Sequence, residues 1–272
     1  MVGEVGAGQV PSLDLTGRTA IVTGAARGIG RACAELLASC GAGVAICDLR
    51  GDELAAVEKG ISEQGRHSGQ VLAMEADVRE AGPTETFVAA AADRFGTLDV
   101  LVNNAGGSFH APVLDVSAKG EAMLVAENFT SVTRLVRLVV PHMTGGGSIV
   151  NVTSIEAHQA APGFAIYSAM KAAVANLTAS LALELSGHGI RVNAIAPDAI
   201  GTSGDDDART EMLAGAARFD PAHIPPLGRR GSPEEAARVV LFLAGDLSAF
   251  VTGTTIHVDG GAHAAGGWRL RT

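Results

Sequence analysis

Short apolar runs recur along the chain, separated by longer stretches whose apolar residues have helical spacing. The runs predict buried strands and lie at 18–23, 44–47, 71–74, 98–102, 148–152, 191–195 and 254–258. The stretches between them predict helices at 29–39, 51–64, 84–95, 118–143, 165–186 and 233–244, the fourth with a slack middle. Strands that alternate with helices of this length favour right-handed crossovers and a parallel sheet covered on both faces.

We therefore expect an α/β protein with a single-domain, Rossmann-type, doubly wound parallel sheet of about seven strands. No linker divides the chain and no internal repeat is found. Residues 1–13 predict a mobile tail, 14–261 the catalytic domain and 262–272 a C-terminal tail. The stretch 198–231 is rich in Gly and Pro, which predicts a lid that orders over a substrate.

Composition narrows the classes of partner. Apolar residues make up 47% of the chain, enough for a large core, and the formal net charge of −9 disfavours nucleic acid. The three cysteines, Cys33, Cys40 and Cys47, match no zinc spacing, so we interpret them as buried reduced thiols. Asp205 to Asp207 fit the solvated first turn of a helix better than a metal site. We expect no metal.

The amino-terminal segment does not resemble a secretory signal. Residues 1–13 contain no Lys or Arg and no apolar run. No apolar stretch approaches the ~20 residues that span a bilayer. We expect a cytoplasmic protein that does not associate with a membrane.

The first strand runs into a glycine-rich turn. Its sequence is Thr23-Gly24-Ala25-Ala26-Arg27-Gly28-Ile29-Gly30. Without Cβ atoms at three positions, a pyrophosphate can approach the backbone and the positive end of the following helix. The position between a strand and a helix supports a dinucleotide-binding turn, although an ordinary strand-to-helix turn stays an alternative.

A carboxylate ends the second strand. Asp48, followed by Leu49, can accept hydrogen bonds from both hydroxyls of the adenosine ribose and would repel a 2′-phosphate, which favours NAD over NADP. Arg27 argues weakly for the opposite preference, and Asp48 could instead be a helix N-cap. Asp77 and Val78 follow the third strand and could receive the adenine amino group.

Tyr167 and Lys171 lie four residues apart on a predicted helix and therefore share one face. A phenol is a weak base at neutral pH, and we expect the neighbouring ammonium to lower the pKa of Tyr167. The phenol would then exchange a proton with an alcohol or ketone. Ser154 follows the fifth strand, and its hydroxyl could hold the substrate oxygen.

Together these motifs resemble the short-chain dehydrogenase/reductase family in its single-domain branch, over roughly residues 15–261. The resemblance rests on Thr23-Gly24-(x)3-Gly28-x-Gly30, Asn103-Asn104-Ala105-Gly106, Asn128, Ser154, Tyr167-(x)3-Lys171, Gly253 and Asp259-Gly260-Gly261. One departure is Asp198, where the family usually has Gly. Asp198 could perturb its loop, contact substrate or be a tolerated variant.

The resemblance implies a role for each matching residue. Asn104, Ala105 and Gly106 would pass beneath the adenosine side of NAD, and Lys171 would also bind the nicotinamide ribose. Asn128 would hold a water that links Lys171 to solvent. Pro197, Ile200 and Thr202 would contact the nicotinamide carboxamide. The family is usually tetrameric, so we expect a homotetramer.

The predicted activity is NAD-dependent interconversion of a secondary alcohol and a ketone. A pocket near Tyr167 would include Ser108, Phe109, His110, Glu156, His158, Gln159, Phe164 and the segment 198–227. Of these, Glu156, His158, Phe164 and Asp198, with Ser154, are candidate contacts to substrate, for which a hydroxyacyl thioester, a cyclic alcohol such as a steroid, or a sugar are possibilities. The alternatives are an NADPH-dependent 3-oxoacyl thioester reductase, a non-enzymatic dinucleotide sensor, and an epimerase or dehydratase.

Overall fold

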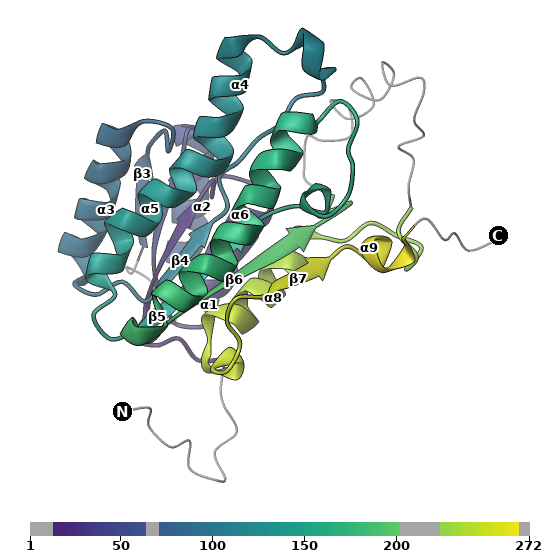
Figure 1. Cartoon of the computed structure of the whole chain (residues 1–272). Helices are drawn as coiled ribbons and strands as arrows, with labels where there is room; N and C mark the ends of the chain where they lie inside the picture. Colours follow the sequence, from purple (N-terminus) through teal and green to yellow (C-terminus); the bar gives the residue numbers. More distant parts are fainter. Residues whose placement is uncertain (1–12, 64–70, 202–223, 267–272) are drawn as a thin grey trace.

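The computed structural model describes residues 13–63, 71–201 and 224–266. Its seven strands form one parallel sheet of order β3-β2-β1-β4-β5-β6-β7 (Figure 1). They are β1 (Thr19–Thr23), β2 (Gly43–Asp48), β3 (Val71–Glu75), β4 (Val100–Asn103), β5 (Gly147–Val152), β6 (Ile190–Pro197) and β7 (Thr255–Val258). The expected doubly wound sheet is confirmed.

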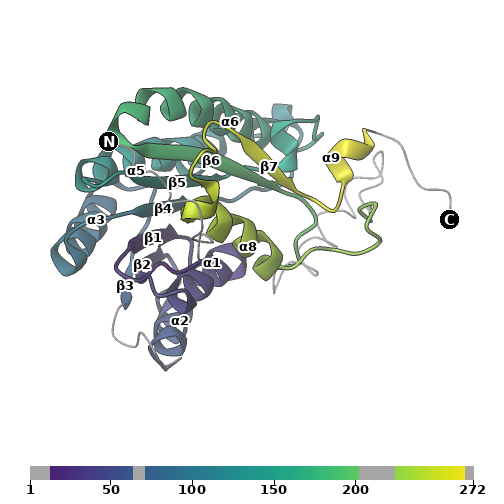
Figure 2. The ribbon, with the colours of Figure 1, turned by 90° about the horizontal axis from the view of Figure 1, so that it is seen from below.

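Helices cover both faces of the sheet (Figure 2). On one face, α1 (Gly28–Ser39), α2 (Gly51–Glu63) and α8 (Pro233–Ala244) bury an apolar core in which α1 packs on α8. On the other, α3 (Ala81–Phe95), α5 (Ser131–Val139) and α6 (Ala165–Glu184) bury a second core around Phe87 and Leu135. The chain reverses direction across the sheet between β1 and β4, which is where doubly wound proteins bind their ligands.

The helix predicted over 118–143 is divided into four parts. An α-helix, α4 (Ala118–Val125), widens into a π-helical turn, η2 (Ala126–Thr130), continues as α5 and ends in the 3-10 turn η3 (Val140–His142). π-Helical turns are rare and often accompany functional sites. Here the wide turn contains Asn128.

Helix α6 changes one expectation from the sequence. It has 20 residues and a mean hydropathy of 1.2, so by length and composition alone it could cross a membrane. By length and mean hydropathy this differs from the expectation that no apolar stretch approaches a bilayer-spanning length, because alanines keep the mean hydropathy high although polar residues interrupt the helix. In this fold the helix is the crossover between β5 and β6 and packs on β6.

Two predicted segments are only partly described. The segment predicted as a C-terminal tail begins with a short helix, α9 (Ala262–Ala265). Of the predicted lid, 202–223 lies outside the described residues, and Thr202 and Asp205 to Asp207 lie outside them too. Within the described ranges, no group of three or more His, Cys, Asp or Glu side chains is arranged to hold a metal ion.

The remaining short 3-10 turns are η1 (Val113–Asp115), η4 (Ile155–Ala157), η5 (Ser186–His188) and η6 (Asp246–Ser248). Two of them matter for the arguments below. η4 follows the carboxyl end of β5 and begins directly after Ser154, which is its N-cap. η6 follows α8 at the opposite edge of the sheet, where the amino ends of β5 and β6 lie.

Candidate active site

The turn between β1 and α1 is fastened to the end of β4. The Asn104 side-chain amide donates to the carbonyls of Thr23 (2.9 Å) and Gly24 (3.0 Å). In return, the Thr23 hydroxyl accepts from the backbone N–H groups of Asn104 (3.2 Å) and Ala105 (3.0 Å). These bonds fix the first turn of the predicted dinucleotide site against the Asn-Asn-Ala-Gly segment.

Glycine is required by this turn at more than one position. Gly24 and Gly28 have φ of +64° and +57°, a region that favours glycine. At Gly30, a Cβ would lie 2.1 Å from the Gly24 carbonyl oxygen and 2.4 Å from the Asn104 amide nitrogen. The backbone is therefore bare and tightly packed where the positive end of α1 begins, which fits a dinucleotide pyrophosphate.

Asp48 lies beside this turn at the carboxyl end of β2. Its carboxylate accepts from the backbone N–H of Ala26 and of Arg50, each at 3.0 Å. The bond from Ala26 holds the carboxylate at the glycine-rich turn, where a partner for ribose hydroxyls would need to be, and the bond from Arg50 fixes its other oxygen. Leu49 next to it is exposed, and Arg27 is also exposed.

Asp77 and Val78, the predicted adenine contacts, are bonded to arginine side chains in the structure. Asp77 forms a two-pronged ion pair with Arg79, with the shortest N–O distance 2.7 Å, and this arginine holds the pKa of Asp77 below its usual range. The Val78 carbonyl accepts from Arg134 at 2.7 Å. Sequence reasoning missed both arginines, because neither belongs to a motif.

The catalytic candidates meet at the carboxyl edge of the sheet. Ser154 follows β5, and Tyr167 and Lys171 lie on the first turns of α6, with the Lys171 ammonium 5.6 Å from the centre of the Tyr167 ring. Lys171 is buried and donates to the Val152 carbonyl at 2.9 Å. The Ser154 hydroxyl lowers the pKa of the Tyr167 phenol, against larger effects that raise it.

Asn128 is hydrogen-bonded to the backbone next to this group. Its side-chain amide donates to the carbonyls of Gly107 (2.8 Å) and Leu124 (3.0 Å), and its oxygen accepts from the Gly107 N–H at 3.3 Å. A Cβ at Gly106 would lie 2.9 Å from the Asn128 oxygen and 3.1 Å from the Lys171 nitrogen. Asn128 therefore holds the segment that runs past Lys171.

The pKa of Tyr167 corrects an expectation from the sequence. Burial raises it, the Glu156 carboxylate raises it further, and the Ser154 hydroxyl only partly opposes the rise, to which Glu127 adds. Burial also lowers the pKa of Lys171 to about 8, against the opposing charges of Glu127 and Glu156. Lys171 is therefore a stronger acid than a free lysine, and it is not among the groups that shift the pKa of Tyr167.

Glu127 is a site residue that the sequence did not reveal. Its carboxylate lies against Gly107, where a Cβ would be 2.9 Å from one carboxylate oxygen. Burial raises the pKa of Glu127, whereas Arg79 and Lys171 lower it. Its position directly before Asn128 in the π-helical turn was the only available signal.

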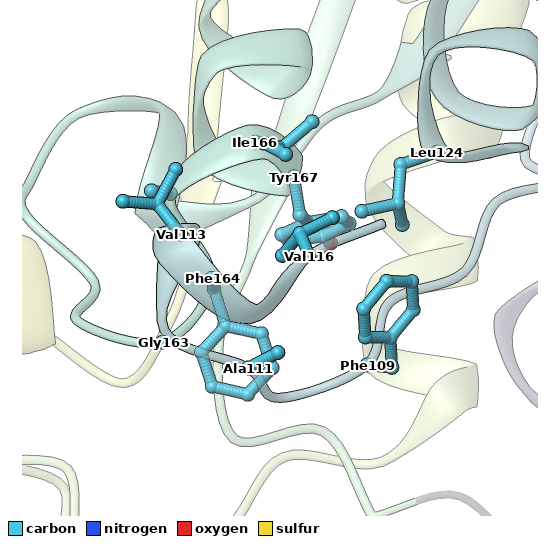
Figure 3. A pocket seen from close by; sticks show the side chains of 10 residues that line it. Phe109, Ala111, Val113, Val116, Leu124, Gly163, Phe164, Ile166 and Tyr167 are labelled. Atoms are coloured by element: carbon cyan, nitrogen blue, oxygen red, sulfur yellow. The ribbon is translucent and has the colours of Figure 1, made fainter. Parts of the chain in front are cut away.

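An apolar pocket adjoins Tyr167 (Figure 3). Its free space is small as the side chains stand, about 10 Å³, which is close to the room that one water molecule needs. The lining residues are Phe109, Ala111, Val113, Val116, Leu124, Gly163, Phe164, Ala165, Ile166 and Tyr167. The tyrosine is the only lining residue with a titratable side chain, so an apolar group that enters here would meet apolar side chains and the phenol.

The predicted substrate contacts lie in different surroundings, and only some of them line the pocket. Phe164 lines the pocket and packs edge-on against His110 at 5.3 Å. Glu156 accepts a hydrogen bond from Ser154 instead of lining it. His158 packs with His257 and His263 at 4.7 and 5.7 Å between ring centres, because the turn after Ser154 carries it towards β7 and α9. Neither of the last two is part of the pocket wall.

The segment after β6 contains the remaining candidates. Pro197 ends β6, and the Asp198 N–H donates to the Val258 carbonyl at 3.1 Å. Ile200 forms an isolated bridge with Gly231. Ala199, which lies between Asp198 and Ile200, has a φ of +49°, an uncommon value for a residue with a side chain. These residues are held at the same edge of the sheet as Ser154.

A bare phosphate-binding turn at the reversal point of the sheet, followed along the edge by Ser154, Tyr167 and Lys171, defines an oxidoreductase that binds a nicotinamide dinucleotide. A family model described as enoyl-(acyl carrier protein) reductase matches residues 24–263. The chain belongs to the short-chain dehydrogenase/reductase family.

Relatives in this family have different substrates in their names. The chain is 38% identical to a 3-oxoacyl-(acyl-carrier-protein) reductase of Thermotoga maritima, over 92% of this chain and 99% of the relative. It is 37% identical to 3beta-hydroxysteroid dehydrogenase 1 of Eggerthella lenta, over 91% and 94%. The crystal structure of a dehydrogenase/reductase from Sinorhizobium meliloti superposes with a TM-score of 0.82 at 35% identity, covering 92% and 97%.

Proposed function

We propose that this protein is an NAD-dependent dehydrogenase that interconverts a secondary alcohol bearing an apolar group and the corresponding ketone. The observation that carries the proposal is the position of Tyr167, whose phenol belongs both to the Ser154–Lys171 group and to the wall of the apolar pocket. A substrate whose apolar part fills this pocket presents its carbinol to the phenol.

The choice of NAD rests on Asp48. Its carboxylate is held by two backbone N–H groups, one of them in the glycine-rich turn. A 2′-phosphate placed there would bring a dianion against a fixed negative charge, whereas two ribose hydroxyls would donate to it. When bound, the dinucleotide supplies the hydride acceptor or donor for the reaction. Gly24, Gly28, Ile29, Gly30, Asn104 to Gly106 and Lys171 would hold it.

The protein's own residues handle the proton and the substrate oxygen. In the oxidation direction, the Tyr167 phenolate takes the proton of the carbinol hydroxyl, and in reduction the phenol returns it. Ser154 contacts the substrate oxygen. Lys171 places a positive charge behind the phenol, and the apolar wall excludes water from the reacting carbon.

A second candidate is an NADPH-dependent reductase of 3-oxoacyl thioesters, since the Thermotoga maritima relative is named for that activity. Asp48 argues against it. A non-enzymatic sensor is disfavoured because Ser154, Tyr167 and Lys171 are all present.

A substrate panel tests the proposal. Secondary alcohols with apolar rings or chains, sugars and 3-hydroxyacyl thioesters would each be offered with NAD and with NADP, while formation of the reduced cofactor is followed. We expect oxidation of an apolar secondary alcohol with NAD at a kcat/KM at least tenfold above that with NADP. Turnover of only the thioester with NADP would establish the second candidate. Binding of NADH without any turnover would favour the sensor.

A further inference from the structure

Ser154 lies between two groups that compete for its hydroxyl hydrogen. On one side, the hydroxyl donates a hydrogen bond to the Glu156 carboxylate, and the Glu156 backbone N–H donates back to the Ser154 oxygen at 3.4 Å. On the other side lies Tyr167, whose pKa the Ser154 hydroxyl lowers. Ser154 is buried and is the N-cap of the turn that contains Glu156, so the three groups are held by local backbone geometry.

We propose that Glu156 is a positioning residue of the active site, whose carboxylate holds the Ser154 hydrogen and thereby leaves the Ser154 oxygen as an acceptor for the Tyr167 phenol. A serine hydroxyl has one hydrogen to donate and lone pairs with which to accept. When the hydrogen is directed to a carboxylate, the bond is charge-assisted and outcompetes a neutral acceptor.

The same carboxylate acts on Tyr167 through its charge. Burial is the largest influence that raises the pKa of Tyr167, and Glu156 is the next. A Ser154 hydrogen bond to the phenolate lowers that pKa, but the hydrogen cannot be donated to the phenolate while Glu156 holds it. Glu156 therefore keeps the phenol protonated in two ways, by its negative charge and by withholding the serine hydrogen.

A simpler role for Glu156 would be only to stabilise the 3-10 turn η4 by binding its N-cap, Ser154. In that case its removal would loosen the turn without changing the proton affinity of Tyr167. The chain makes the two roles separable, because Tyr167 is its only tyrosine. Ultraviolet absorbance of tyrosinate therefore reports the ionisation of this one residue in the full-length protein, without cofactor or substrate, and Tyr167→Phe supplies the blank.

Three variants separate the effect of the Glu156 charge on Tyr167 from the effect of its hydrogen bond with Ser154. Glu156→Gln removes the charge but keeps a side-chain oxygen that can accept from Ser154. Glu156→Ala removes both the charge and the acceptor. Glu127→Gln is the matched control, because Glu127 also raises the pKa of Tyr167 while no hydrogen bond joins it to Ser154 among the described contacts. Thermal melts would verify that each variant is folded at the pH values used.

The proposal predicts an order of titration. Tyr167 should ionise at the highest pH in the wild type, at a slightly lower pH in Glu127→Gln, lower again in Glu156→Gln, and lowest in Glu156→Ala. The ionisation constant in Glu156→Ala should exceed that of the wild type by about tenfold or more. If Tyr167 ionises at the same pH in Glu156→Ala as in the wild type, the proposal is overturned. Identical curves for Glu156→Gln and Glu156→Ala would overturn the positioning of Ser154.

A kinetic measurement extends the test and rests on the proposed function. The rise of kcat/KM for alcohol oxidation with pH should begin at lower pH in both Glu156 variants than in the wild type, because the phenolate forms more easily. A rise at unchanged pH in both variants would contradict the role of Glu156. If the wild type oxidises no alcohol, the proposed function fails, while the tyrosinate titration still decides whether Glu156 positions Ser154.

Discussion

Lys171 is a cation with almost no access to water. Only 4% of the residue is exposed, and its nitrogen donates to the Val152 carbonyl. Burial lowers its pKa from 10.5 to about 8, with Glu127 and Glu156 opposing the fall. A pKa this far below the ordinary value means that the folded state holds the charge at a cost in stability. The catalytic group therefore weakens the fold that contains it.

Replacement of Lys171 by Met should stabilise the protein and abolish turnover. The change in pKa corresponds to about 3 kcal/mol, of which loss of the hydrogen bond to Val152 removes about 1. The melting temperature at pH 7 should rise by roughly 5 °C. Between about pH 8 and 10.5 the unfolded chain binds the extra proton, so wild-type stability gains with pH. The difference in melting temperature between Lys171→Met and the wild type should therefore shrink from about pH 8 to 10.5. A difference that stays constant over this range would contradict the pKa assigned to Lys171.

Asp48 should determine the choice of cofactor. In Asp48→Ser the repulsion of a 2′-phosphate is removed, while Arg27 and Arg50 stay nearby as possible phosphate partners. We expect kcat/KM with NADP to rise at least tenfold and that with NAD to fall. Asp52→Ser is the matched control, since Asp52 is an exposed carboxylate in the first turn of α2 and should leave both values unchanged. Equal effects of the two substitutions would contradict a specific role for Asp48.

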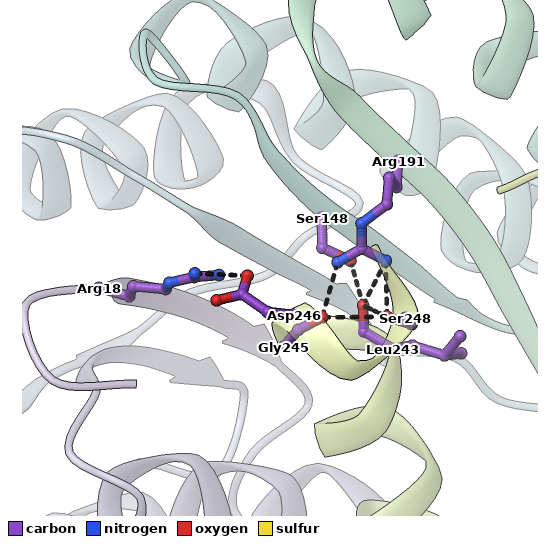
Figure 4. A network of polar contacts seen from close by, with 7 residues as sticks. All are labelled: Arg18, Ser148, Arg191, Leu243, Gly245, Asp246 and Ser248. Carbon is purple, nitrogen blue, oxygen red and sulfur yellow. Dashed lines mark hydrogen bonds and ion pairs between the residues drawn. The ribbon is translucent and has the colours of Figure 1, made fainter. Parts of the chain in front are cut away.

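At the scale of elements, Arg191 joins the amino end of β6 to the end of α8 (Figure 4). Its guanidinium donates to the Leu243 carbonyl (2.9 Å), the Ser248 hydroxyl (2.8 Å) and the Gly245 carbonyl (3.1 Å). Ser148 on β5 donates to the same Leu243 carbonyl at 2.7 Å. Burial lowers the pKa of Arg191. The cation lies at the carboxyl end of a helix, where it shares the last carbonyls with the Ser148 and Ser248 hydroxyls and where positive charge is favourable.

Arg191→Met should destabilise the fold without changing the chemistry. The variant removes the three guanidinium hydrogen bonds, but the Ser148 and Ser248 hydroxyls still donate to the Leu243 and Gly245 carbonyls, so the expected loss is about 1–2 kcal/mol. The melting temperature should fall by roughly 3–6 °C. Because the network lies at the edge of the sheet opposite Tyr167, kcat should stay within about twofold of wild type at 25 °C. A large fall in kcat with an unchanged melting temperature would contradict this assignment.

Elements differ in how far their sequences predict them. The seven strands and the crossover helices were predicted, because buried parallel strands are short apolar runs and the helices have regular spacing. The π-helical turn Ala126–Thr130 was not predicted beyond a slack middle, since one extra residue in a turn leaves only a phase change in the pattern. That turn is what brings Glu127 and Asn128 to the active site.

At the scale of the whole molecule, the sequence located the dinucleotide turn, the Ser154–Tyr167–Lys171 group and two pocket residues, Phe109 and Phe164, but not most of the pocket lining. Val113, Leu124 and Ile166 belong to different segments, and none carries a chemical signal of its own. Glu156 and His158 were predicted as possible contacts to a polar substrate. The 3-10 turn at 155–157 directs them to Ser154 and to the His257–His263 pair instead.

We also propose that the chain assembles into a homotetramer. Leu183 near the end of α6 is 78% exposed, and Phe250 is fully exposed. A Cβ at Gly253 would lie 3.4 Å from the Ala182 Cβ, so the segments that contain Leu183 and Phe250 run close to one another. Exposed apolar residues that gather in this way often mark an interface between proteins. Sedimentation should give a mass about four times the 27.5 kDa of the chain, and the double substitution Leu183→Lys with Phe250→Asp should reduce it. A wild-type monomer would contradict the proposal.

The central claim is that Tyr167 transfers the proton in NAD-linked oxidation of an alcohol. The most direct measurement compares wild type and Tyr167→Phe for NADH formation from the best alcohol of the panel, together with NADH binding to each. We predict at least a thousandfold loss of kcat in the variant, with NADH binding within about threefold of wild type. Turnover by Tyr167→Phe near the wild-type rate would contradict the account.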